Sequence, residues 1–297
     1  MKNAILLLVF FTTCTCSITT YATTYYARTT GNWSGSVWST SPTGTASTAT
    51  IDVTDDVVVQ DGVTITVNLE STTVASLTIG GGTSGKLQLD SYIYYNALLV
   101  PVQFTSLVIV TGDVIVNQGA ILTTVDETGI NISNIIVGGN LVVNGTLSTN
   151  TDPLSFTFNK NGVAIISGNG ILSFNDITIG TNNNILLATD ITHNGTITVS
   201  GGNLYVGYLK TLTLGAGIVV SSSNSVNVLG TINCNTNVIS DATLNTGSFI
   251  LVGTATVTPT GNTTFGSSSI ASVSSITGVS IGMGITGLGI PTGTFVT

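Results

Sequence analysis

The stretch that decides the fold is IIVGGNLVVNGTL, residues 135–147. It joins two short runs of β-branched residues through turns made of Gly and Asn. Similar phrases recur at 76–80 (SLTIG), 107–117 (LVIVTGDVIVN), 177–180 (ITIG) and 194–199 (NGTITV). Strands this short bury a face only when copies stack on one another. The recurrence therefore predicts an all-β chain folded as a single parallel β-solenoid (β-helix).

The composition agrees with an all-β chain. Of the 297 residues only 6% are charged, 42% are hydrophobic and 35 are Gly, whereas ordinary soluble domains carry about 25% charged residues. Thr, Ser, Asn and Gly replace the missing charge, and these residues suit exposed strand faces and tight turns. The apolar content is high enough for a packed core, which argues against disorder.

The N-terminus has the pattern of a secretory signal peptide. Lys2 supplies the positive charge, residues 4–11 form a short apolar run, and a small-residue cleavage site ends at Ala22. We expect residues 1–22 to be a signal peptide and the mature chain to start near Thr23. The apolar run is shorter than the roughly 20 residues that a membrane span needs, so no membrane span is expected.

Removal of the signal peptide leaves Cys234 as the last of three cysteines, so no intrachain disulfide is expected. Four basic residues then face 13 acidic ones, which gives a net charge of −9. Four scattered cations cannot build a basic patch, so nucleic acid is not an expected partner.

The mature chain divides into three parts. Residues 23–50 are rich in aromatics and are expected to form an N-terminal cap over the open edge of the first tier. Residues 51–258 are expected to form the solenoid, in tiers of roughly 20–30 residues; about ten tiers at about 4.8 Å each give a length on the order of 50 Å. Residues 259–297 form a Gly/Ser/Thr-rich start of a further repeat or linker, which we expect to be truncated.

Period-two alternation predicts which residues point inward. They are Ile79, Val108, Val110, Ile136, Leu141, Val143, Ile177, Ile179 and Val199. Residues 92–104 (YIYYNALLVPVQF) break the pattern, because they lack Gly punctuation and include Pro101. This segment is expected to be an inserted loop or a bulged tier.

Two stretches resemble a known class of proteins. They are YYARTTGNWS (residues 25–34) with VWS (37–39), and DDVVVQDGVTITV (55–67). Both are similar to the N-terminal regions of repetitive, adhesin-like β-solenoid surface or secreted proteins of Bacteroidetes, although Val63 stands where that class usually has His. The resemblance implies a right-handed solenoid, export by the type IX secretion route, and a place at the outer-membrane surface or outside a Gram-negative cell. That class carries a C-terminal sorting domain which this chain lacks, so an N-terminal fragment is expected.

Two sets of side chains are candidate sites. The acidic cluster Asp52, Asp55, Asp56 and Asp61 could offer oxygen ligands to calcium; the alternative is that these carboxylates cap turns. The aromatic set Tyr25, Tyr26, Trp33 and Trp38 could stack on a glycan; the alternative is that these rings belong to the cap. No other cofactor is expected.

Catalytic groups are not expected. His193 is the single histidine and is expected to be a solvated turn residue, so it cannot complete a Ser-His-Asp arrangement. Asp176 and Asp190 have no basic partner near them in sequence. Pairs of Thr two residues apart, such as Thr64/Thr66, Thr196/Thr198, Thr211/Thr213 and Thr254/Thr256, could order water if they stacked into one array.

The sequence therefore favours a non-enzymatic extracellular surface adhesin or structural stalk. Its expected partners are polysaccharides or proteins at a cell surface or outside the cell. Two alternatives stay open: a glycan-binding or polysaccharide-degrading β-helix protein, and an ice-binding solenoid.

Overall fold

The computed structural model describes residues 22–96, 98–125, 132–148, 153–172, 176–179, 183–193, 197–199, 201–214, 218–220, 225–228, 231–234, 248–251 and parts of the stretch from 262 to 297. The expected signal peptide lies outside these residues, apart from Ala22. Within them every regular element is a strand, which confirms the all-β prediction. None of the described segments forms a helix long and apolar enough to span a membrane.

The longest sheet has 11 strands and is parallel, with one antiparallel pair, β1–β3, at its end. In spatial order it contains β3 (Trp38–Ser39), β1 (Thr24–Ala27), β4 (Asp56–Val59), β7 (Ser76–Ile79), β12 (Val114–Val116), β15 (Leu141–Val143), β18 (Gly162–Ser167), β21 (Asn183–Leu187), β24 (Asn203–Val206), β27 (Ser225–Val228) and β29 (Ser248–Leu251).

Three further parallel sheets accompany it. The second sheet contains β2 (Gly31–Asn32), β5 (Thr64–Val67), β8 (Lys86–Leu89), β13 (Ile121–Thr124), β16 (Thr146–Leu147) and β19 (Ile171–Leu172). The third contains β6 (Ser71–Val74), β11 (Leu107–Val110), β14 (Ser133–Val137), β17 (Leu154–Phe158), β20 (Asp176–Ile179), β23 (Ile197–Val199) and β26 (Ile218–Val220). The fourth contains β22 (Ile191–His193), β25 (Thr211–Leu214) and β28 (Thr231–Cys234).

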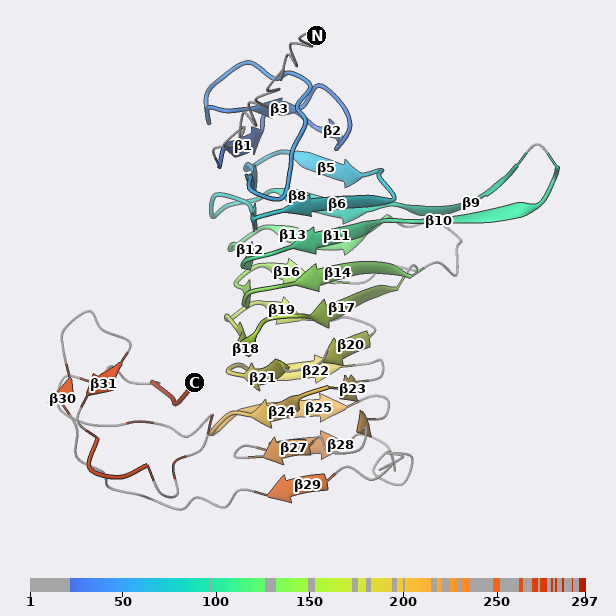
Figure 1. Ribbon diagram of the computed structural model, residues 1–297. Coiled ribbons are helices and arrows are strands. Elements are labelled where there is room, and N and C mark those ends of the chain that lie inside the picture. Colours follow the sequence, from blue (N-terminus) through green and yellow to red (C-terminus); the bar gives the residue numbers. More distant parts are fainter. Residues whose placement is uncertain are drawn as a thin grey trace, which may run out of the picture.

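The chain visits these sheets in a fixed order. It places β12 in the first sheet, β13 in the second and β14 in the third, and then returns to the first sheet with β15. Within these four sheets, strands of consecutive rounds pair in parallel; Val114, for example, lies opposite Leu141. The strands accordingly lie in tiers along one axis, from β1 near one end to β29 at the other (Figure 1).

The core is built from in-register columns of aliphatic side chains. Val57, Leu77, Val114, Leu141 and Ile166 follow one another across the first sheet, and all five are fully buried. Alternate residues on the same strands face outward. Short β-branched strands suit this arrangement because every tier presents the same apolar face to its neighbours.

Eight of the nine inward predictions are confirmed, and Ile136 is wrong. Ile136 is half-buried, while Ile135 and Val137 are fully buried. Ile135 lies opposite Val108, and Val137 lies opposite Val110. The run is apolar at every position, so its own period could not decide which residues face the core; the pairing partner decides it.

Residues 92–96 and 98–104 belong to a hairpin inserted between β8 and β11. Its strands are β9 (Ser91–Tyr95) and β10 (Pro101–Thr105), which pair antiparallel. The hairpin extends sideways from the stack of tiers, well beyond the other strands (Figure 1). A second antiparallel pair, β30 (Asn262–Thr263) with β31 (Ile270–Ala271), lies near the C-terminus.

Candidate functional site

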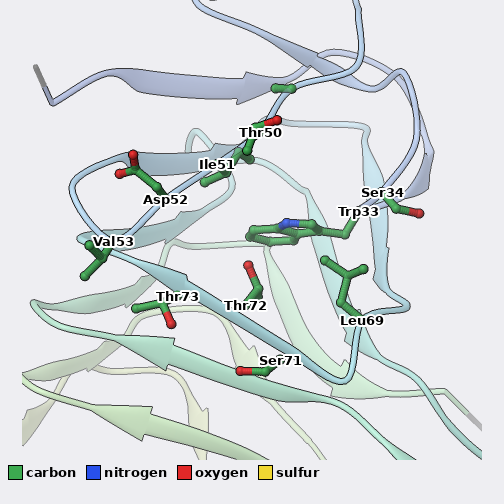
Figure 2. Close-up of a pocket in the computed structure, with 11 residues that line it drawn as sticks. Trp33, Ser34, Thr50, Ile51, Asp52, Val53, Leu69, Ser71, Thr72 and Thr73 are labelled. Carbon is green, nitrogen blue, oxygen red and sulfur yellow. The ribbon is translucent and has the colours of Figure 1, made fainter. Parts of the chain in front are cut away.

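A groove of about 410 Å³ lies at the N-terminal end of the stack. Its walls come from the loop around Ile51 and Asp52 and from β6, where Thr72 lies, while the ring of Trp33 and the side chain of Leu69 extend into it (Figure 2). Small-molecule sites commonly have volumes of about 300–1,000 Å³. Apolar side chains and hydroxyl groups line this groove, and Asp52 is the ionisable group among them.

Backbone and ring contacts hold Trp33 in place. Its N–H donates to the carbonyl of Thr66 at 2.8 Å, and its own carbonyl accepts a hydrogen bond from the indole Nε1 of Trp38, also at 2.8 Å. The two indole rings meet edge to face, with centroids 4.8 Å apart. This pair links the loop after β2 to β3 and fills the end of the core.

The structure separates the four aromatic candidates into two kinds. Trp38 is fully buried and Trp33 is 3% exposed, so neither indole presents an open face to a sugar ring. Tyr25 is half-buried and packs against the core, and Tyr26 is half-buried in the same strand, β1. The arrangement suits the cap interpretation of the two tryptophans better than a stacking platform.

The carboxylates of Asp52 and Asp55 accept hydrogen bonds from residues at the N-terminal end of the stack. The buried Asp55 carboxylate accepts from the N–H of Thr23 at 3.0 Å and from the N–H of Asp52 at 2.9 Å. The exposed Asp52 carboxylate accepts from the hydroxyl and the N–H of Thr54 at 2.7 and 2.8 Å. Both bonds lower the pKa of Asp52 below its ordinary value of 3.8, and the bond from the hydroxyl has the larger effect.

The other two acidic candidates also accept hydrogen bonds from neighbouring tiers. Asp56 accepts one from the hydroxyl of Ser76. Asp61 accepts from the N–H groups of Gly81 at 2.7 Å and Ser84 at 3.0 Å, and these bonds lower its pKa. Among the described residues no group of three or more His, Cys, Asp or Glu side chains is placed to hold a metal ion. Asp52, Asp55 and Asp61 bind backbone N–H groups of turns and loops, whereas Asp56 bonds the side chain that faces it in the neighbouring strand.

The prediction that His193 is a solvated turn residue is wrong. His193 ends strand β22 and is fully buried, not solvated in a turn. Its partner in the next tier is Leu214, so it occupies a core position in the fourth sheet. Sequence reasoning missed this because the Asn-Gly pair that follows signals a turn, while the alternation of Ile191 and His193 around Thr192 signals a strand face.

Asp176 and Asp190 lie on different sides of the stack. Asp176 begins β20 in the third sheet, opposite Ser155. Asp190 precedes β22, and its carboxylate accepts from the N–H of Thr211 at 2.7 Å. The structure does not bring the two together as an acid–base pair.

One column of threonines lies on the third sheet, and the sequence analysis named only Thr198 among its members. Thr157, Thr178 and Thr198 lie in register on the outer side of the third sheet, with Ile136 before them. The Thr64/Thr66 pair lies instead beside Lys86 and Gln88 in the second sheet. Thr196, Thr254 and Thr256 lie outside the described residues.

Comparison with protein-family models, with curated proteins and with solved structures finds no match to this chain.

Proposed function

We propose that the chain is a non-enzymatic extracellular surface adhesin or structural stalk, built as a single right-handed β-solenoid with the tryptophan pair as its N-terminal cap. The constant register of the first sheet carries this proposal. From β1 to β29 each strand pairs in parallel with its counterpart one round later. A sheet spacing of about 4.8 Å gives these tiers a length of about 45 Å.

Such a body suits a spacer because each further round lengthens it without a new core. Polar contacts between tiers add to the aliphatic columns. The amide Nδ2 of Asn117 donates to the carbonyl of Gly80 at 2.6 Å, and the buried Nδ2 of Asn183 donates to the carbonyl of Phe158 at 3.1 Å. Both bonds satisfy corner carbonyls across consecutive tiers, which stiffens the corners of the stack.

The proposed location is the outer-membrane surface or the extracellular space of a Gram-negative bacterium. The signal-peptide pattern of residues 1–22 supports export. The resemblance of residues 25–39 and 55–67 supports an origin in Bacteroidetes and the type IX route. The expected ligands are polysaccharides or proteins of other cells or of a matrix.

An in-frame deletion tests the solenoid. Removing residues 114–140 takes out β12, β13 and β14 and joins the end of one round to Leu141, which then occupies the place of Val114 beside Leu77. We expect a folded, cooperative protein, because β7, β8 and β11 can then pair in parallel with β15, β16 and β17 in place of the deleted strands. The matched control removes residues 114–125 alone, which deletes two strands of a round, and we expect it to lose its β-sheet circular dichroism signal. Equal behaviour of the two deletions would contradict a solenoid.

Deletion of the gene tests the function. We expect weaker attachment and biofilm formation, restored by the full chain expressed from a plasmid. The purified protein is incubated in parallel with a panel of polysaccharides. Normal attachment of the deletion strain together with release of oligosaccharides would replace the adhesin proposal with a polysaccharide-degrading enzyme.

A further inference from the structure

The two most exposed large apolar side chains among the described residues, Leu98 and Leu99, lie at the tip of the β9–β10 hairpin. Leu98 is 82% exposed and Leu99 81%, and more than half of Val100 is exposed. Tyr95, just below the tip, is 67% exposed, and exposure falls to 8% at Phe104 near the base. The β9–β10 hairpin extends well away from the stack of tiers (Figure 1).

The base of the hairpin is fixed to the stack. The ring of Phe104 is buried and stacks on Tyr92, with centroids 4.7 Å apart and planes inclined by 18°. The buried hydroxyl of Ser106 donates to the carbonyl of Val67 at 2.7 Å. These contacts aim the hairpin outward from the stack.

Several backbone groups of the described residues in the turn at the tip are hydrogen-bonded within the turn. The carboxamide oxygen of Asn96 accepts from the N–H groups of Leu98 and Val100, both at 3.0 Å. The backbone of Asn96 also bonds to Val100 and to Leu99, at 3.1 and 2.9 Å. Backbone groups bonded in this way can leave water at a low desolvation cost.

Leu99 adopts a backbone conformation that disfavours leucine. Its φ is 59°, in the left-handed region that Gly and Asn tolerate best. A leucine there strains the backbone and leaves its own side chain in water. Leu209 has a similar φ of 56° in another turn, so the role of Leu99 is inferred from its place at the tip of the hairpin and not from its φ.

The charge of the hairpin and its exposed side chains indicate which kind of partner binds the tip. Residues 91–105 contain no charged residue, whereas the whole chain carries a net charge of −8. The exposed side chains also follow an order along the hairpin, with the aliphatic Leu98, Leu99 and Val100 at the tip and the rings of Tyr94 and Tyr95 just behind them. An uncharged apolar phase that surrounds the tip on all sides fits these features better than a second copy of the chain.

We propose that the hairpin tip is a peripheral membrane anchor, in which Leu98, Leu99 and Val100 insert into the hydrocarbon of a zwitterionic phospholipid leaflet. Tyr94 and Tyr95 then lie at the level of the headgroups, where tyrosine is favoured because its ring is apolar and its hydroxyl polar. The rest of the chain stays in water. This anchor goes beyond the stalk function and does not depend on it.

Flotation with phosphatidylcholine vesicles tests the anchor, using the purified mature chain. We expect the wild type to float with the vesicles and Leu99→Asn to bind about tenfold more weakly, because one leucine no longer leaves water. Asn fits the left-handed conformation, so the variant should unfold at no lower urea concentration than the wild type. This separates loss of the apolar group from loss of folding.

Leu209 provides the matched control. It is 77% exposed and has a φ of 56°, yet it lies in the turn between β24 and β25 rather than on the hairpin. Leu209→Asn should bind vesicles as the wild type does. Added anionic lipid should not strengthen binding, since the chain is acidic.

Four results would overturn the anchor. They are no flotation of the wild type, equal binding of Leu99→Asn and the wild type, equal losses in the two variants, and binding that grows with anionic lipid. Sedimentation without lipid tests whether the tip binds a second copy of the chain. A dimer that Leu99→Asn abolishes would assign the tip to that second copy and overturn the anchor. The deletion and attachment tests of the stalk function do not depend on any of these results.

Discussion

Leu141→Ala measures how tightly the aliphatic columns hold the tiers together. Leu141 is fully buried between Val114 and Ile166, which are themselves fully buried in the adjacent strands. Hydrogen-bonded strands keep those neighbours at a fixed spacing, so the site cannot collapse onto the cavity. Leu→Ala substitutions in cores cost about 2–5 kcal/mol, more where relaxation is limited. We therefore expect a loss of about 3–4 kcal/mol in the free energy of unfolding.

The matched control is Val142→Ala, one residue further along the same strand. Val142 is half-buried and faces outward, so its substitution should cost about 1 kcal/mol or less. Urea unfolding followed by the β-sheet circular dichroism signal measures both variants. The slope should stay as in the wild type, so each loss appears as a shift of the midpoint. Equal losses at the two positions would refute the inward and outward assignment of β15.

Three further predictions concern corners and processing. Gly112→Ala should destabilise the chain by about 1–3 kcal/mol in the same urea assay, because the added Cβ would lie 2.7 Å from the carbonyl oxygen of Ala75; an unchanged midpoint would contradict it. Asp61 has a lowered pKa in the folded state, so its stabilisation is present above its ordinary value of 3.8 and is lost as the pH falls through the lowered value. Asp61→Asn should therefore flatten the loss of stability in acid, and an identical acid titration would argue against the turn cap. N-terminal sequencing of the secreted protein should start within a few residues of Thr23, and a full-length cytoplasmic product would contradict the signal peptide.

The sequence alone determined the strand character of the chain and most of its inward positions. In Thr64-Ile65-Thr66-Val67 the alternation is strict, and Ile65 and Val67 are fully buried as that pattern requires. A one-residue shift would have exposed both apolar side chains to water, so the local pattern suffices there.

Only the tertiary structure decided the positions where the local pattern is uniform or misleading. Ile136 faces outward because Ile135 pairs with Val108, a contact between residues far apart in sequence. His193 is buried because its strand pairs with β25, in which Leu214 lies opposite it and is itself buried. For residues 92–104 the sequence predicts only an inserted loop or a bulged tier. No local pattern tells whether Leu99 packs against the stack or extends away from it. In each case the deciding free energy comes from neighbours one or more tiers away, which a single stretch of sequence does not contain.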